Sequence, residues 1–248
     1  MPTLITIPLT LSSADARRLP ANANRALHAT FFRWLEQGDA ELTHAVHEKM
    51  EVKPYTVAPL KINNDGRAEM RVSLLHDDLL PALEAGMDPL VQIVDVGLPF
   101  DADPHIEQVS YEELAQRAGA HTSLRLRFTS PTAFSRNNMH YLLPDATLVF
   151  ASYRARWNAF APEPLRIDDD WMDWLIQTVA ISDMSLRVEE LRYGQYHLKG
   201  FVGWVQYTIA GKNDLADGCE PFNALADYAR FCGTGHKTTQ GLGQTYRE

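Results

Sequence analysis

Two histidines and a lysine in the first quarter of the chain are candidates for acid–base chemistry. His28 lies in a stretch with helical spacing, His47 lies near the end of the next such stretch, and Lys53 follows six residues later. Imidazole can give or take a proton near neutral pH, and an ammonium group can balance the negative charge of a transition state. A lone histidine beside apolar residues is more often a packing or surface residue, so spacing alone leaves both interpretations open.

A glycine-rich segment near the end of the chain is the second candidate. It follows an apolar helical stretch and combines one histidine, one lysine and three threonines with four glycines. Glycines allow positive φ and a close approach of the backbone to a phosphate, and the lysine and hydroxyls add donors for oxyanions. It is not a Walker A loop, because the GxxxxGK[ST] order is absent, and the other interpretation is an ordinary turn. The candidate binding residues are Gly233, Gly235, His236, Lys237, Thr238, Thr239, Gly241 and Gly243.

We expect no metal ligand set and no cofactor. The segment His44–Glu48, His-Ala-Val-His-Glu, could suggest a metal pair at helical spacing, but it matches neither zincin order. Cys219 and Cys232 show no CxxC spacing, so we expect reduced thiols that serve packing. The chain shows neither a secretory signal at its start nor an apolar run of about 18 residues, which predicts a cytoplasmic protein.

The net charge of −9 argues against a general nucleic-acid binder, because affinity for a polyanion comes largely from lysine and arginine. The acidic excess lies in residues 1–120, with 10 basic and 18 acidic side chains, whereas residues 121–248 hold 13 and 14. The basic residues of the second half could form one face or be scattered, solvated charge. Those considered are Arg125, Arg127, Arg136, Arg154, Arg156, Arg187, Arg192, Lys199, Arg230 and Lys237.

The chain opens with a predicted strand followed by two predicted helical stretches. The strand covers residues 4–9, and Asn22 or Asn24 is predicted to cap the first helix. Asp39 is predicted to cap the second stretch, which runs through residue 46. The apolar side of the first helix is formed by Leu27, Phe31, Trp34 and Leu35.

Strands and a short helix complete the first half. Strands at residues 55–57 and 70–74 are predicted to form a hairpin after the Asn63–Gly66 turn. A helix at residues 79–84 then leads to a closing strand at residues 90–94. The resulting order, strand, helix, strand, strand, helix, strand, is that of a ferredoxin-like domain.

The second half repeats this order without sequence identity between the halves. Residues 100–120 form a predicted connection with an extra strand or a short helix, and the boundary falls near Gly119. The predicted elements that follow are a strand at 124–128 ending at the turn 129–132, a helix at 171–179, strands at 184–188 and 200–207, a helix at 222–231, and a last strand at 243–246.

Four stretches together resemble the CRISPR-associated endoribonucleases of the Cas6 family, in the RAMP superfamily. They lie in the expected order across nearly the whole chain. The resemblance implies an α+β protein of two tandem ferredoxin-like (RRM-like, βαββαβ) domains, which we place at residues 1–119 and 120–248. The stretches are the glycine-rich signature Ala229–Gln244, Leu126–Phe134, Gly200–Val205, and His47 followed by Lys53–Thr56.

The resemblance also implies an activity. In this family a ribose 2′-hydroxyl of CRISPR repeat RNA attacks the adjacent phosphate without a metal, leaving a 2′,3′-cyclic phosphate and a 5′-hydroxyl. His28, His47 and Lys53 look like the catalytic residues, and the glycine loop and Arg136 look like RNA-binding residues. Some members use a tyrosine on the first helix where this chain has two phenylalanines, so the roles of base and acid stay open.

The implied partners are pre-crRNA and crRNA, subunits of a CRISPR effector complex, and a second copy of the chain. Two alternatives stay open. A non-cleaving RNA-binding subunit could have the same duplicated fold, and an unrelated ferredoxin-like protein could bind a small anion in the glycine loop. For the endoribonuclease, we expect the loop to act in RNA binding and the histidines, in the other domain, to act in chemistry.

Overall fold

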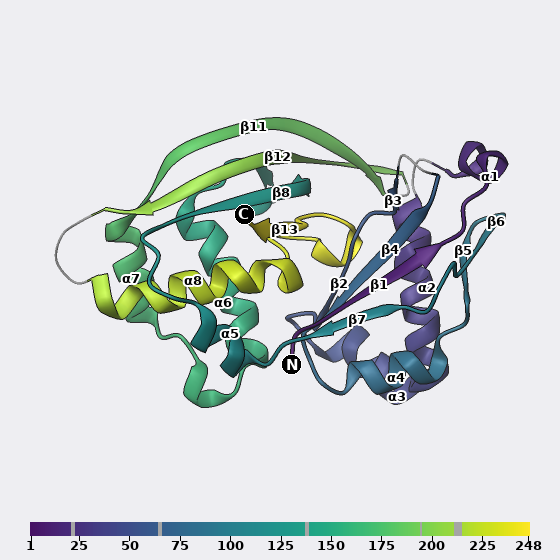
Figure 1. Cartoon of the computed structure of the whole chain (residues 1–248), viewed down its shortest axis with the longest axis horizontal. Helices are drawn as coiled ribbons and strands as arrows, with labels where there is room; N and C mark the ends of the chain where they lie inside the picture. Colours follow the sequence, from purple (N-terminus) through teal and green to yellow (C-terminus); the bar gives the residue numbers. More distant parts are fainter. Residues whose placement is uncertain (21–22, 64–65, 137–138, 194, 211–214) are drawn as a thin grey trace.

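The first half of the chain contains a five-stranded antiparallel sheet (Figure 1). The computed structural model describes residues 1–20, 23–63, 66–136, 139–193, 195–210 and 215–248. The strand order, β2-β4-β1-β7, is that of a ferredoxin-like sheet, and β3 pairs with β4 beside it. The strands are β1 (Thr3–Leu9), β2 (Tyr55–Val57), β3 (Lys61–Ile62), β4 (Ala68–Leu74) and β7 (His105–Gln108).

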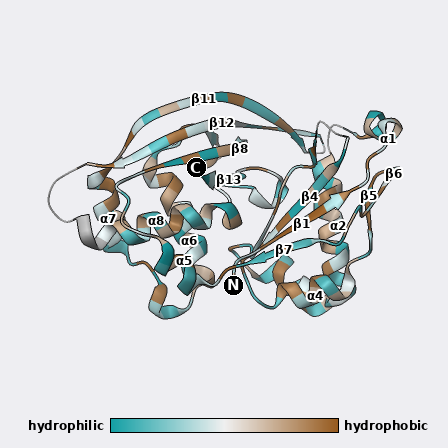
Figure 2. Ribbon diagram, viewed as in Figure 1, coloured by the Kyte–Doolittle hydropathy of each residue, from teal (hydrophilic) through white to brown (hydrophobic). Residues whose placement is uncertain are grey.

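Helices cover one face of this sheet. Alternate residues of the strands, among them Ile5, Ile7 and Met70, are fully buried in one cluster with Phe31 and Trp34, as the period of two in a half-buried strand requires. Figure 2 shows hydrophobic residues along β1. The helical elements are α1 (Ser13–Arg18), α2 (Ala23–Gly38), α3 (Ala40–His44), the π-helix η1 (Ala45–Lys49) and α4 (Leu79–Gly86).

The predicted closing strand at residues 90–94 is wrong in its pairing. Strand β5 (Leu90–Ile93) leaves the main sheet and forms a hairpin with β6 (Val96–Pro99), across a tight turn in which Val94 has a φ of 54°. The closing strand is β7, which pairs with β1. Its residues are mostly exposed, so β7 lacks the apolar alternation that makes a strand visible in a sequence.

The second half contains a four-stranded sheet of the order β11-β12-β8-β13, again that of a ferredoxin-like fold. The predicted fold class is therefore confirmed. The strands of this half, including a small separate hairpin, are β8 (Ser123–Thr132), β9 (Phe134–Arg136), β10 (Met139–Tyr141), β11 (Val179–Tyr193), β12 (Tyr196–Ile209) and β13 (Thr245–Arg247). The helical elements are α6 (Ala146–Phe160), η2 (Glu163–Leu165), α7 (Asp169–Thr178), α8 (Leu215–Cys232) and η3 (Thr238–Gln240). Helix α5 (Tyr111–Arg117) comes before residue 120 in the chain but packs into the core of this half.

Three local predictions differ from the structure. Strand β8 continues through Pro131 to Thr132 instead of stopping at a turn, and α6 was not predicted at all. Asn24 lies inside α2 and is buried, so it is not the cap of that helix; Asn22 and the middle of the Asn63–Gly66 turn lie outside the described residues. Asp39 accepts from the N–H of Leu42, which confirms the second cap.

The open face of the first sheet lies against the second half of the chain. Arg71 of β4 donates to Oε1 of Gln244 at 2.6 Å, and Arg230 of α8 forms a bidentate pair with Glu107 of β7 at 2.8 and 2.9 Å. A cleft of about 670 Å³ separates the sheets beside these contacts. Within the described ranges, no helix has the length and hydropathy that crossing a bilayer requires.

Candidate functional site

His28 and His47 both contact the ring of Phe32. Helix α2 carries His28 and Phe32 one turn apart, and η1 places His47 against the same ring. The centroid of Phe32 is 5.0 Å from that of His28 and 5.5 Å from that of His47. The two imidazole centroids are therefore no more than 10.5 Å apart, the sum of these distances. The structure thus brings together the two histidines that the sequence pairs.

The imidazole of His28 is half-buried and contacts Tyr55. Its Nε2 lies 3.1 Å from the Tyr55 hydroxyl. Burial, and then the charge of His47, lower the pKa of His28 to about 4, because loss of water disfavours the charged ring. Burial raises the pKa of the Tyr55 phenol well above its usual range, and an interaction with the side chain of Thr239 opposes this shift. Both groups are therefore uncharged at neutral pH.

His47 is exposed, with 64% of its side chain accessible to solvent. Its Nδ1 lies 2.7 Å from Oε1 of Glu48, and this hydrogen bond is the main cause that lowers the pKa of the Glu48 carboxyl. The carboxylate orients the imidazole and can balance a positive charge on it. The ring then presents its other nitrogen, Nε2, for proton exchange.

Lys53 holds the end of the helical segment that carries His47. Its Nζ donates to the backbone carbonyls of Val46 at 3.0 Å and His47 at 2.8 Å. A cation is favoured at the carboxyl end of a helix, where carbonyls lack partners. Because an ammonium group has three donors, one N–H of Lys53 remains for another ligand.

The glycine loop is closed by contacts within the protein. The N–H groups of Thr234, His236 and Gly243 donate to backbone carbonyls at 2.8 to 3.0 Å. A Cβ on Gly235 would lie 2.3 Å from the carbonyl oxygen of Ala133, beside the end of β8. The loop therefore has fewer free N–H groups to offer a phosphate than its glycine content suggests.

The other three glycines of the loop also face protein atoms. A Cβ on Gly243 would lie 2.1 Å from the carbonyl oxygen of Thr234, and one on Gly233 would lie 3.0 Å from that of Gly243. A Cβ on Gly241 would lie 3.3 Å from Cδ2 of Leu191. Their most direct role in the structure is thus to let the loop pack.

A hollow of about 340 Å³ joins Lys53 to the glycine loop. Lys237, exposed and in the left-handed region with a φ of 56°, lies at this hollow. The guanidinium of Arg156 on α6 supports the loop by donating a hydrogen bond to the carbonyl of Gly235 at 2.7 Å. The basic and hydroxyl side chains that line the hollow are Lys53, Ser152, Arg156, His236, Lys237, Thr238 and Thr239.

Arg136 lies in the hairpin of β9 and β10, which contacts the loop through a pair of histidines. The rings of His140 and His236 are 4.8 Å apart, and the guanidinium of Arg136 lies 5.7 Å from the centroid of Tyr141. Both ring nitrogens of His236 are buried without a hydrogen-bond partner. Burial, then His140 and Lys237, lower the pKa of His236 to about 4. The predicted catalytic and binding residues thus adjoin each other, although the sequence places them in different domains.

This chain is similar in sequence and fold to proteins named Cas6. The family model described as CRISPR-associated endoribonuclease Cas6 matches residues 126–245. A Streptococcus thermophilus protein named CRISPR-associated endoribonuclease Cas6 is 23% identical over 217 residues, which cover 84% of this chain and 86% of that protein. The predicted resemblance to the Cas6 family is confirmed.

Solved Cas6 structures have the same fold over their whole length. A Thermus thermophilus Cas6, in a product complex, has a TM-score of 0.85 to this chain at 24% identity, with both chains covered completely. A second Cas6, also titled as a product complex, has a TM-score of 0.82 at 25% identity and the same complete coverage. The tandem ferredoxin-like arrangement is therefore shared with the Cas6 family.

The basic residues of the second half do not form one face in this Cas6-like chain. Arg154 lies on α6, on the helical side of the sheet, and pairs with Asp169 at 2.7 Å. Arg125 and Arg127 lie on β8 opposite the buried face of that strand, and both pair with Glu248. Of the two alternatives that the sequence leaves open, the structure favours scattered charge, because these arginines lie on opposite sides of the sheet and pair with nearby carboxylates.

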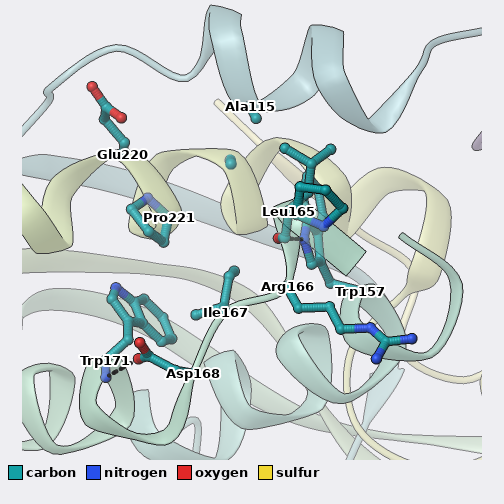
Figure 3. A pocket seen from close by; sticks show the side chains of 11 residues that line it. Ala115, Trp157, Leu165, Arg166, Ile167, Asp168, Trp171, Glu220 and Pro221 are labelled. Atoms are coloured by element: carbon teal, nitrogen blue, oxygen red, sulfur yellow. Dashed lines mark hydrogen bonds between the residues drawn. The ribbon is translucent and has the colours of Figure 1, made fainter. Parts of the chain in front are cut away.

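A hollow on the helical side of the second half lies apart from these residues (Figure 3). Its volume is about 340 Å³, and Trp157, Trp171 and Pro221 line it. The indole N–H of Trp171 donates to the carbonyl of Gly218 at 3.1 Å, so this ring is held in the core. Of the residues that we predict to be catalytic or RNA-binding, none is among the described residues that line this hollow.

Sequence reasoning missed the roles of Tyr55 and Arg156. Tyr55 lies within one of the stretches that resemble Cas6, but its contact with His28 joins a strand to a helix and has no signature in the spacing. Arg156 was one of several basic residues, and only the fold shows that it supports the loop.

The chain should lose stability as the pH falls from about 6.5 to 4. The pKa of His28 is about 4 in the folded chain and about 6.5 when unfolded, so in this window the unfolded state binds more protons. At pH 4 the protonation of His28 lowers the free energy of unfolding by at most about 3 kcal/mol. Urea unfolding at several pH values should show a smaller loss for His28→Gln than for the parent, and equal losses would contradict the burial of a neutral His28.

Proposed function

We propose that this chain is an endoribonuclease that cleaves CRISPR repeat RNA, or pre-crRNA, at a specific sequence and without a metal, and so matures crRNA. The family match and the relatives named as endoribonucleases support the reaction class. The related Cas6 structures titled as product complexes, and one titled as a substrate mimic complex, support an RNA partner. The site residues are His28, His47 and Lys53, with the glycine loop and Arg136 as the RNA-binding residues.

The observation that carries this proposal is the pair of histidines that contact Phe32, beside a hollow lined by basic side chains. A phosphodiester that contacts both imidazoles would have a proton acceptor at His28 and a proton donor at His47. This is the arrangement that attack by a 2′-hydroxyl requires.

In the proposed mechanism, His28 is the base and His47 is the acid. Neutral His28 takes the proton of the ribose 2′-hydroxyl, whose oxygen attacks phosphorus. A nearby phosphate raises the proton affinity of a buried imidazole, so RNA binding makes His28 a stronger base. Protonated His47, balanced by Glu48, gives its proton to the leaving 5′-oxygen. The third N–H of Lys53 donates to the phosphorane, and the products are a 2′,3′-cyclic phosphate and a 5′-hydroxyl.

Cleavage of labelled repeat RNA should persist in excess EDTA, because the side chains supply the proton transfer and charge balance that a cation would otherwise supply. The measurement is the single-turnover rate with and without chelator. Loss of cleavage in EDTA and its return with magnesium would contradict the mechanism. A cyclic phosphate end, identified by mass spectrometry of the 5′ fragment, would support it.

The second candidate is a non-cleaving RNA-binding subunit of a CRISPR effector complex. The observation that favours it is that Lys53 already donates to two backbone carbonyls, which is a sufficient structural role. Binding of repeat RNA without cleavage would select this candidate. Association with effector subunits, or as a homodimer, stays a prediction for size-exclusion chromatography with and without RNA.

A further inference from the structure

Tyr55 lies at the point where the histidine pair and the glycine loop meet. It begins β2 and is 3% exposed. Its ring stacks on that of Phe31, with centroids 4.6 Å apart, and meets the edge of Phe32 at 5.5 Å. Aromatic packing on two sides fixes the direction of the hydroxyl. The Tyr55 side chain is therefore held in one orientation, and its hydroxyl can hold a neighbouring polar group in place.

The hydroxyl of Tyr55 has two polar neighbours, one from each half of the chain. It lies 3.1 Å from Nε2 of His28, and Thr239 of η3, which packs against β2, lies near enough for its side chain to affect the pKa of the phenol. A phenol has one proton to donate and can also accept. Tyr55 can therefore accept from one partner while it donates to the other.

The other nitrogen of the His28 ring reaches solvent. No hydrogen bond within the described residues involves Nδ1, and Nδ1 is not among the buried polar atoms that lack a partner. A neutral imidazole carries one proton, and the hydrogen bond that one nitrogen makes decides which nitrogen holds it. The contact with Tyr55 thus controls whether Nδ1 can accept a proton.

We propose that Tyr55, supported by Thr239, is a positioning residue for His28: its phenol oxygen accepts the Nε2–H and so keeps Nδ1 unprotonated and open to the ribose 2′-hydroxyl. In the reaction, Nδ1 takes the 2′-hydroxyl proton to give an imidazolium, and the proton that Tyr55 holds stays on the phenol. Thr239 accepts that phenol proton, so the glycine loop supports the base as well as the RNA. This inference rests on the proposed function for its catalytic part.

The tautomer of His28 can be measured in the free protein. Long-range ¹H–¹⁵N NMR spectra should show Nε2 protonated and Nδ1 unprotonated near pH 7, with His28→Gln identifying the signals. Tyr55→Phe keeps the packed ring, removes the hydroxyl and should give a mixture of tautomers. A parent protein with the proton on Nδ1 would overturn the inference without reference to any reaction.

The rate of cleavage gives the second readout. Tyr55→Phe should lower the single-turnover rate roughly tenfold, the typical effect of losing a group that orients a functional histidine, and leave the Kd for repeat RNA unchanged. Thr239→Val should slow cleavage less, and Thr239→Ser, which keeps the hydroxyl, should restore the parent rate. An unchanged rate in Tyr55→Phe would overturn the inference.

Tyr111→Phe is the matched control. Tyr111 is also 3% exposed, and its hydroxyl contacts the carbonyl of Leu75 and the hydroxyl of Tyr228, none of which is in the proposed site. Equal slowing by Tyr111→Phe and Tyr55→Phe would assign the effect to packing and overturn the inference. A parent chain that cleaves no repeat RNA would refute the proposed function and the catalytic part here, while the NMR spectra would still decide the tautomer.

Discussion

His47→Ala should slow single-turnover cleavage of repeat RNA by about a hundredfold, the usual contribution of one positioned acid or base. The affinity for RNA should change little, because the side chain of His47 is 64% exposed and its ring, among the described residues, contacts Glu48 and Phe32. The measurement is cleavage at saturating enzyme, with the Kd determined separately from the uncleavable 2′-deoxy RNA.

His44→Ala is the control for this change. His44 lies one helical turn before His47, is also exposed, and has the same type of side chain on the same segment. The His44→Ala variant should cleave repeat RNA at the parent rate. If both variants cleave at the parent rate, His47 is not the acid. If both lose activity together with thermal stability, the segment and not the imidazole is responsible.

Most of the fold follows from local patterns. The alternation of Met70, Val72 and Leu74 and the helical spacing of Phe31 and Trp34 both mark faces that are buried in the structure. The closing strand of the first sheet does not follow, because β7 is an edge strand with mostly exposed residues. A short apolar run such as residues 90–93 fits a separate hairpin as well as a central strand.

The candidate site is predictable in its residue types but not in its connections. His28, His47 and the glycine loop can be chosen from the sequence because each belongs to a stretch that resembles one family. Their proximity cannot, because it depends on how η3 of one half packs against α2 and β2 of the other. The contact of Tyr55 with both sides is a tertiary property that no spacing rule encodes.

Gly235→Ala should destabilise the folded chain by about 3 kcal/mol, because two costs add. The residue has a φ of +74°, which disfavours any Cβ by about 1–2 kcal/mol. Its Cβ would also lie 2.3 Å from the carbonyl oxygen of Ala133, and forcing such a contact apart costs about 1–3 kcal/mol. The melting temperature should fall by roughly 6–12 °C.

Two controls test whether the glycines of the loop are needed for its backbone packing or for the approach of an RNA phosphate. Gly66→Ala has a similar φ of +83° but no atom within 4 Å of the new Cβ, so it should cost only about 1 kcal/mol. Lys237→Asn tolerates the left-handed backbone and should leave stability unchanged, while it weakens RNA binding and lowers the salt dependence by about one phosphate contact. If Gly235→Ala instead melts like the parent and binds RNA more weakly, the glycine faces the RNA and not Ala133. The expected result is the reverse, because the oxygen of Ala133 already occupies the space that a side chain at position 235 would need.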